Sequence, residues 1–123
     1  MDDIALSEGV IGCAIEVHRH LGPGLLESAY EDCLCFELAA EGITFERQLQ
    51  LPVTYKGVKL DAGYRLDILV ASRLVVEVKA VERIVAIHEA QLLTYLRMSG
   101  HRVGLILNFN HAVLKDGIRR LAL

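Results

Sequence analysis

The sequence lacks most of the features that mark a secreted, membrane-bound or multidomain protein. It has three cysteines, Cys13, Cys33 and Cys35, and an odd number argues for free thiols rather than a disulfide framework. No apolar run approaches the roughly 18–20 residues that a membrane span needs. Neither a signal peptide nor a Ser/Pro-rich linker or repeat is visible. These absences predict a cytoplasmic protein without membrane contact, folded as one domain over residues 1–123.

An excess of positive charge is also missing. The chain has 13 Lys and Arg against 16 Asp and Glu, a net charge of −3, so no global field attracts a polyanion such as nucleic acid. Any such contact must come from a local patch. Two clusters are candidates, and each can also be a solvated face: Lys115 with Arg119 and Arg120, and Arg97 with His101 and Arg102.

Apolar residues are abundant, at 53% of the chain. One interpretation is a surface for a homo-oligomer or a partner protein. The other is a well-filled core with long strands, and the composition does not choose between them.

Hydrophobic periodicity predicts an α/β protein with the order α-α-β-β-β-α-β and a terminal strand. Helices are expected over Ile4–Leu21, Leu25–Ala40 and Ile87–Ser99, and strands over Phe45–Tyr55, Val58–Val70, Arg73–Ala80 and Arg102–Phe109. Lys56-Gly57 indicates a hairpin between the first two strands. The tail from Val113 is ambiguous, although Asp116-Gly117 indicates a turn into a last short strand. A crossover through the third helix places helices on the faces of the sheet.

The strand around Glu77 carries the first chemical signal. Because strand residues alternate between faces, Val75, Glu77 and Lys79 point to one side of Leu74–Ala80. An acid and an amine are therefore directed together from an otherwise apolar strand, where burial of charge is costly. A mutual ion pair between Glu77 and Lys79 is the simpler interpretation of this strand by itself.

Asp67 interrupts the neighbouring apolar strand near its middle. A short hairpin between the two strands places Asp67 beside Glu77, where two carboxylates repel unless a cation or a proton intervenes. Oxygen ligands at short range select a hard ion, Mg²⁺ or Mn²⁺. The pair therefore predicts a metal site.

Two helices offer polar side chains on one face. Glu27 and Tyr30 are three residues apart, and His88, Gln91 and Tyr95 follow helical spacing along the third helix. Tyr30 can equally be a core ring with a hydrogen-bonded hydroxyl. These residues are candidates for the same site.

The segment Gly24-Leu25-Leu26-Glu27-Ser28-Ala29-Tyr30 is the most distinctive motif of the chain. It resembles the signature of the GxxExxY proteins, a family of the PD-(D/E)XK nuclease superfamily. The resemblance covers almost the whole chain through these further segments: Ile15–His18, Leu21–Gly24, Tyr64–Asp67, Glu77–Val81, Gln91–Leu96, Gly104–Phe109 and Gly117–Arg120. Gln91 and Tyr95 also resemble the Q-x-x-x-Y helix of RecB-type exonucleases.

The resemblance implies a restriction-endonuclease-like core with a mixed central sheet flanked by helices. It implies that Asp67, Glu77 and the Val78 carbonyl bind Mg²⁺ or Mn²⁺, and that Glu27 reaches the metal directly or through water. Lys79 would activate the attacking water and stabilise the transition state. Gln91 and Tyr95 would hold Lys79 or a substrate phosphate.

The chain departs from this pattern in two places. Leu66 stands where the PD motif has proline, which matters little because only the aspartate binds metal. RecB-type relatives with an iron–sulfur cluster have four cysteines, so the three cysteines here are expected in the core.

Two functions compete on these observations. The first is a metal-dependent nuclease that hydrolyses DNA or RNA. The second is a non-catalytic, nuclease-like module that binds a partner protein or nucleic acid without cutting it.

Overall fold

The computed structural model describes all of residues 1–123 as three helices, seven strands and a short 3-10 helix. The helices are α1 (Asp3–Leu21), α2 (Glu27–Ala40) and α3 (Ala86–Ser99). The strands are β1 (Phe45–Gln50), β2 (Val53–Tyr55), β3 (Val58–Leu60), β4 (Arg65–Val70), β5 (Leu74–Lys79), β6 (Val103–Asn108) and β7 (Ile118–Ala122), with the 3-10 helix η1 (Leu114–Gly117) before the last. None of the helices combines the length and the apolar character that spanning a membrane requires.

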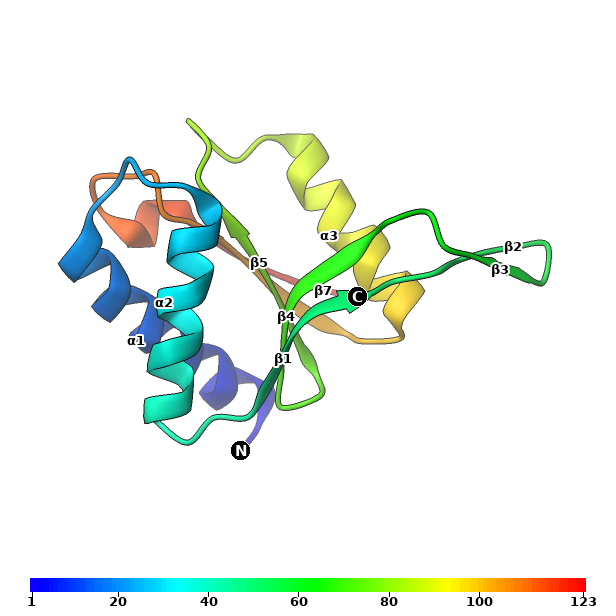
Figure 1. The fold of residues 1–123 in the computed structure, drawn as a ribbon, viewed down its shortest axis with the longest axis horizontal. Helices are drawn as coiled ribbons and strands as arrows, with labels where there is room; N and C mark the ends of the chain where they lie inside the picture. Colours follow the sequence, from blue (N-terminus) through cyan, green and yellow to red (C-terminus); the bar gives the residue numbers. More distant parts are fainter.

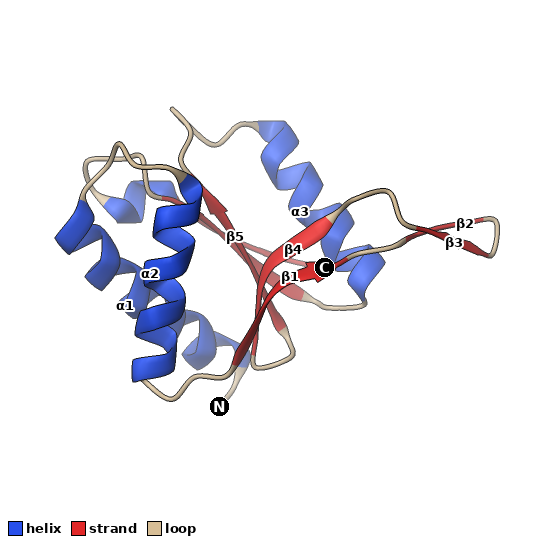
Figure 2. Ribbon diagram, in the orientation of Figure 1, coloured by secondary structure: helices blue, strands red, loops and turns tan.

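A five-stranded sheet forms the centre of the molecule, in the order β1-β4-β5-β6-β7. Strands β5 and β6 are parallel and the other neighbours are antiparallel, so the sheet is mixed. Helix α3 makes the crossover between the two parallel strands. Figure 2 shows α1 and α2 on one side of the sheet and α3 on the other. The predicted α/β fold with a mixed sheet flanked by helices is confirmed.

The two faces of the sheet are packed unequally. A core cluster of 19 buried residues includes Leu74, Val76 and Val78 and lies under α1 and α2. A smaller cluster of 8 buried residues includes Val75 and lies under α3. The expected alternation along β5 is therefore confirmed, and Glu77 and Lys79 follow Val75 towards the less filled α3 side.

The first predicted hairpin is divided into two parts. Strand β1 pairs with β4 in the main sheet, whereas β2 and β3 form a separate two-stranded ribbon that projects from the body (Figure 1). The division falls at Leu51-Pro52 and at Asp61–Gly63. Proline has no N–H for a ladder bond, and the Asp61 carboxylate accepts the Gly63 N–H in a turn (3.0 Å). The predicted turn is present at the ribbon tip, where Lys56 and Gly57 both have positive φ.

Helix α2 begins at Glu27, two residues after the start that periodicity predicted. Leu26 has extended backbone, with φ −73° and ψ 153°, and the Leu25 N–H donates to the Tyr30 hydroxyl (3.1 Å) rather than entering a helical bond. This side-chain contact ends the preceding loop and fixes the first helical residue.

Candidate functional site

Strands β4 and β5 bring Asp67 and Glu77 together. Their antiparallel register pairs Ile68 with Val76, and continuing it by one residue sets Asp67 opposite Glu77. The ladder stops at this point, and Asp67 Oδ2 accepts the Val78 N–H at 2.9 Å in place of a backbone partner. The carboxylate of Asp67 therefore occupies the position where the two strands separate.

The ladder between β1 and β4 is interrupted at the same residue. The pairing passes from Arg47–Ile68 to Leu49–Leu66, and Gln48, which faces Asp67 in that register, has a φ of 51°. A non-glycine residue in the left-handed region is strained. Regular pairing is thus relaxed on both sides of Asp67.

Glu77 is the most perturbed acid of the chain. The residue is 6% exposed, and its Oε1 is buried without a hydrogen-bond partner. Burial, together with the neighbouring Asp67 carboxylate, raises the pKa of Glu77 to about 10, although Lys79 opposes the shift. A proton or a cation must therefore accompany this carboxylate at neutral pH.

Lys79 makes no ion pair in the structure, so the simple Glu77–Lys79 salt bridge is absent. Its Nζ instead donates to Gln91 Oε1 on α3 at 3.4 Å. Gln91 Nε2 in turn donates to the Tyr95 hydroxyl at 3.0 Å. Burial and the charge of Glu77 raise the pKa of Tyr95. Lys79, Gln91 and Tyr95 thus form one chain of contacts beside the acidic pair.

Glu27 approaches from the opposite helix layer and meets the sheet where β5 ends. Its Oε2 accepts the Ala80 N–H at 3.3 Å, and its side chain is exposed. No group of three or more His, Cys, Asp or Glu side chains lies close enough to hold a metal ion. The structure therefore brings two of the three predicted acidic ligands together, Asp67 and Glu77, and leaves Glu27 at the end of the strand.

The loop before α2 explains how Glu27 is held there. Tyr30 is fully buried, and its hydroxyl donates to the Gly22 carbonyl at 2.6 Å while accepting the Leu25 N–H. The Tyr30 ring stacks on Phe109, with centroids 4.6 Å apart. Gly24 has a φ of 102°, and its N–H donates to Asn110 Oδ1 at 3.1 Å. Tyr30 is therefore a core ring that positions the loop, not a free phosphate contact.

Sequence reasoning missed Asn108, which is fully buried at the end of β6. Its Oδ1 accepts the Val81 N–H at 3.0 Å, and its Nδ2 donates to the Val81 carbonyl at 2.9 Å. This amide fastens the segment that follows Lys79. The available signal was a lone polar residue at the end of an apolar strand.

Other polar groups have structural partners. The His88 Nδ1 accepts the Val85 N–H at the start of α3, and the His18 Nε2 bonds the His111 carbonyl at 2.7 Å. All three cysteines are free, with Cys13 and Cys35 buried and Cys33 half-buried. Cys13 and Cys35 belong to the core cluster, as expected, whereas Cys33 is only partly buried and packs against that cluster.

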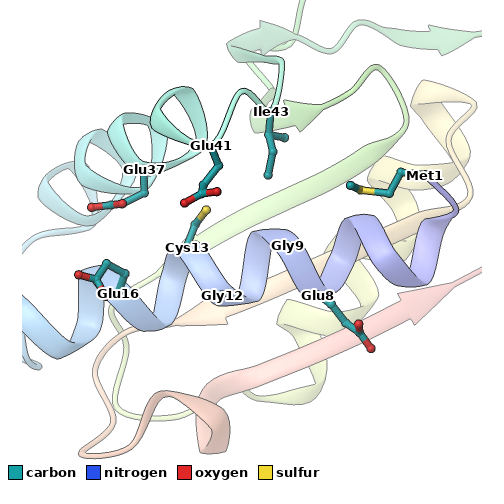
Figure 3. Close-up of a pocket in the computed structure, with 9 residues that line it drawn as sticks. All are labelled: Met1, Glu8, Gly9, Gly12, Cys13, Glu16, Glu37, Glu41 and Ile43. Atoms are coloured by element: carbon teal, nitrogen blue, oxygen red, sulfur yellow. The ribbon is translucent and has the colours of Figure 1, made fainter.

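A separate hollow lies between α1 and α2 (Figure 3). Glu16, Glu37, Glu41 and Cys13 line it, beside the small residues Gly9 and Gly12. Burial and the nearby glutamates raise the pKa of Cys13, which keeps the thiol protonated. This hollow contains no buried unpaired ligand and has no contact with the Asp67–Glu77 pair.

Comparison with known proteins finds one family model that matches the chain. A family model described as the PD-(D/E)XK nuclease superfamily matches residues 4–121, nearly the whole length. No curated protein and no solved structure matches.

Proposed function

Because this chain belongs to the PD-(D/E)XK nuclease superfamily, we propose that it is a metal-dependent nuclease that hydrolyses phosphodiester bonds of DNA or RNA. The observation that carries the proposal is the buried Glu77 carboxylate opposite Asp67, with the Lys79 amine, which has no ion pair, two residues further along β5. Within the superfamily we assign the chain to the GxxExxY proteins, on the loop in which Gly24 and Tyr30 hold Glu27.

The residues present fit a hard divalent cation, the kind of metal that nucleases of this superfamily generally use. Glu77 Oε1 is a buried oxygen without a partner, and Asp67 supplies a second carboxylate beside it. Mg²⁺ and Mn²⁺ bind through one or two carboxylates and keep several waters. Asp67, Glu77 and the Val78 carbonyl would hold the ion, with Glu27 acting through a water. A bound ion supplies Lewis acidity towards water and phosphate oxygens.

Lys79 supplies the positive charge of the reaction centre. Because no carboxylate neutralises it within 4.0 Å, its ammonium can orient the attacking water and offset charge that develops on the phosphate. Gln91 and Tyr95 act through Lys79: the amide of Gln91 accepts from Nζ and is itself fixed by the Tyr95 hydroxyl. They are positioning residues in this proposal.

Purified protein incubated with Mg²⁺ or Mn²⁺ and mixed DNA and RNA substrates tests the proposal. Asp67→Ala should lower cleavage on the order of 100-fold or more, whereas Asp116→Ala, which removes an exposed carboxylate in η1, should leave it unchanged. Mn²⁺ at a hundredfold excess over its Kd should stabilise the wild type by about 2.7 kcal/mol and should not stabilise Asp67→Ala.

The non-catalytic module remains the competing function, and exposed apolar side chains favour it. Leu26, Phe36 and Ile87 are 78%, 72% and 70% exposed. Two measurements distinguish the functions: light scattering gives the oligomeric state, and the cleavage assay gives the activity. A monomer that cuts nucleic acid only with an intact Asp67 would exclude a pure binding module, whereas a melt insensitive to Mn²⁺ and no cleavage would support it.

A further inference from the structure

A groove adjoins the acidic pair on the α3 side of the sheet. It has a volume of about 570 Å³, within the roughly 300–1,000 Å³ that small-ligand pockets occupy. Its walls come from the outer turns of α3, from Tyr64 just before β4, and from Val53 at the base of the ribbon. Figure 1 shows the ribbon leaving the body beside α3. The groove is therefore bounded by the helix that carries Gln91 and Tyr95.

Two tyrosines form an aromatic corner in this groove. The ring of Tyr64 is 6.0 Å from that of Tyr95 and inclined to it by 61°. Tyr95 is buried and bonded to Gln91, whereas Tyr64 is 44% exposed and offers a free ring face. The backbone of Tyr64 is fixed, because its carbonyl accepts the Leu51 N–H at 2.8 Å. Tyr64 is thus a partly exposed aromatic ring whose backbone is tied to Leu51.

Charge in the groove does not suit a duplex backbone. No Lys or Arg lines it, and the chain as a whole has a net charge of −3. Duplex binding depends on several phosphate contacts from basic side chains. The nearest cations lie at its border: exposed Arg65 follows Tyr64, and Arg97 Nη2 donates to Thr94 Oγ1 at 3.1 Å. Lys56 and Lys59 lie further along, on the exposed ribbon. The surface is suited to the face of a base, not to a run of phosphates.

The polar groups at the rim are few and specific. Thr94 and His88 border the groove, and Ile87 adds an exposed aliphatic side chain. Unpaired bases bind proteins by stacking on aromatic side chains, with sequence tolerance because every base has a π-face. Gln91 and Tyr95 line the groove and bond to each other, and Gln91 also accepts a hydrogen bond from Lys79 in the reaction centre. A base stacked on Tyr64 would therefore lie beside the residues that contact Lys79, next to the acidic pair.

We propose that the substrate is single-stranded nucleic acid, with an unpaired base stacked on Tyr64 while the adjoining phosphodiester lies at Asp67 and Glu77. This inference rests on the proposed nuclease function. Lys56 and Lys59 of the ribbon contact the backbone of the same strand further along. Single-stranded DNA and single-stranded RNA both offer the unpaired base that this stacking requires.

Fluorescence anisotropy in EDTA, which prevents metal-dependent cleavage, measures the binding of single-stranded nucleic acid by itself. Labelled single-stranded DNA and RNA of one unstructured sequence are compared with the matching duplex. Both single strands should bind more tightly than the duplex, and the tighter of the two identifies the natural sugar. The slope of log K against log salt should be no steeper than about −2, because few phosphates are neutralised.

Variants at one position supply the specific readout. Tyr64→Ala should weaken single-strand binding by about 5- to 150-fold, the effect of losing one stacked base. Tyr64→Leu, which keeps apolar bulk without a ring, should weaken it similarly, and Tyr64→Phe should bind like the wild type. Phe36→Ala removes a 72% exposed ring from α2 and is the matched control, with no expected change.

The two proposals fail separately. Tighter binding or faster cleavage of the duplex, or Tyr64→Leu with wild-type affinity, would overturn the single-strand inference even if Asp67→Ala abolishes cleavage. Conversely, Tyr64-dependent binding of single strands without any Asp67-dependent cleavage would retain the binding surface and defeat the nuclease.

Discussion

At the residue scale, Glu77 concentrates the chemistry of this chain. It is a nearly inaccessible carboxyl with one unpartnered oxygen, next to a second carboxylate and an amine without an ion pair. An unsatisfied buried polar atom costs about 1–3 kcal/mol. Such a cost indicates a site that is completed by something else, because no group of the protein hydrogen-bonds Glu77 Oε1.

The pKa of Glu77 gives a testable pH dependence in metal-free protein. Its folded value of about 10 is above the ordinary value of 4.5, so its contribution to stability is fully present below pH 4.5 and is lost as pH rises towards 10. Glu77→Gln, which cannot ionise, should therefore be more stable than the wild type at pH 8, by at most about 5 kcal/mol.

Urea unfolding in EDTA at several values between pH 5 and pH 9 measures this difference. The gap between Glu77→Gln and wild type should widen as pH rises, by at most about 1.4 kcal/mol per unit. Glu82→Gln, an exposed acid in the loop before α3, should follow the wild type at every pH. A Glu77→Gln protein that is less stable at pH 8 would show that the ionised carboxylate has a partner.

At the scale of elements, the start of α2 decides where Glu27 lies. The Tyr30 hydroxyl bridges the Gly22 carbonyl and the Leu25 N–H, and the loop so held delivers Glu27 to the Ala80 N–H at the end of β5. The spacing of Gly24, Glu27 and Tyr30 therefore has a structural explanation. Tyr30 fixes the loop by two hydrogen bonds, and the start of α2 then points Glu27 at the end of β5.

Tyr30→Phe tests this account because it keeps the ring stacked on Phe109 and removes only the hydroxyl. We expect the free energy of unfolding to fall by about 1–2 kcal/mol, as two hydrogen bonds are lost. We also expect kcat to fall more than substrate affinity, since the displaced group is Glu27 rather than the Tyr64 groove. Urea melts and single-turnover cleavage measure the two effects.

Tyr55→Phe is the control for stability, because Tyr55 is 60% exposed on the ribbon. It should not change the unfolding free energy. Full activity in Tyr30→Phe would separate the loop from catalysis and leave Tyr30 a purely structural residue.

At the scale of the whole molecule, the ribbon of β2 and β3 stands apart from the fold. It forms its own two-stranded sheet, and every residue from Thr54 to Leu60 is exposed. An isolated hairpin of this kind is only marginally stable in water. The ribbon contributes little to the core, and its tip carries basic rather than acidic side chains.

Replacing residues 54–59 with a Gly-Gly turn should leave the free energy of unfolding within about 0.5 kcal/mol of wild type. Single-strand affinity should fall, and its salt dependence should flatten, because Lys56 and Lys59 are removed. Arg19→Ala, which removes an exposed cation from α1, is the control and should change neither. A drop of several degrees in Tm would show that the ribbon supports the body.

The sequence by itself determined the α/β class, the crossover through α3 and the shared face of Val75, Glu77 and Lys79. These follow from periodicity, because backbone geometry fixes which side of a helix or strand each residue occupies. The hairpin that sets Asp67 beside Glu77 was equally local, since only three residues separate β4 from β5.

Only the tertiary structure decided which partners these groups have. Lys79 bonds Gln91 rather than Glu77, Asn108 fastens Val81, and Tyr30 holds the loop that delays α2 to Glu27. Each contact joins residues from different elements, so its choice depends on how helices and sheet pack and on which polar atoms that packing buries. Periodicity reports the direction of a side chain, whereas packing determines what it meets.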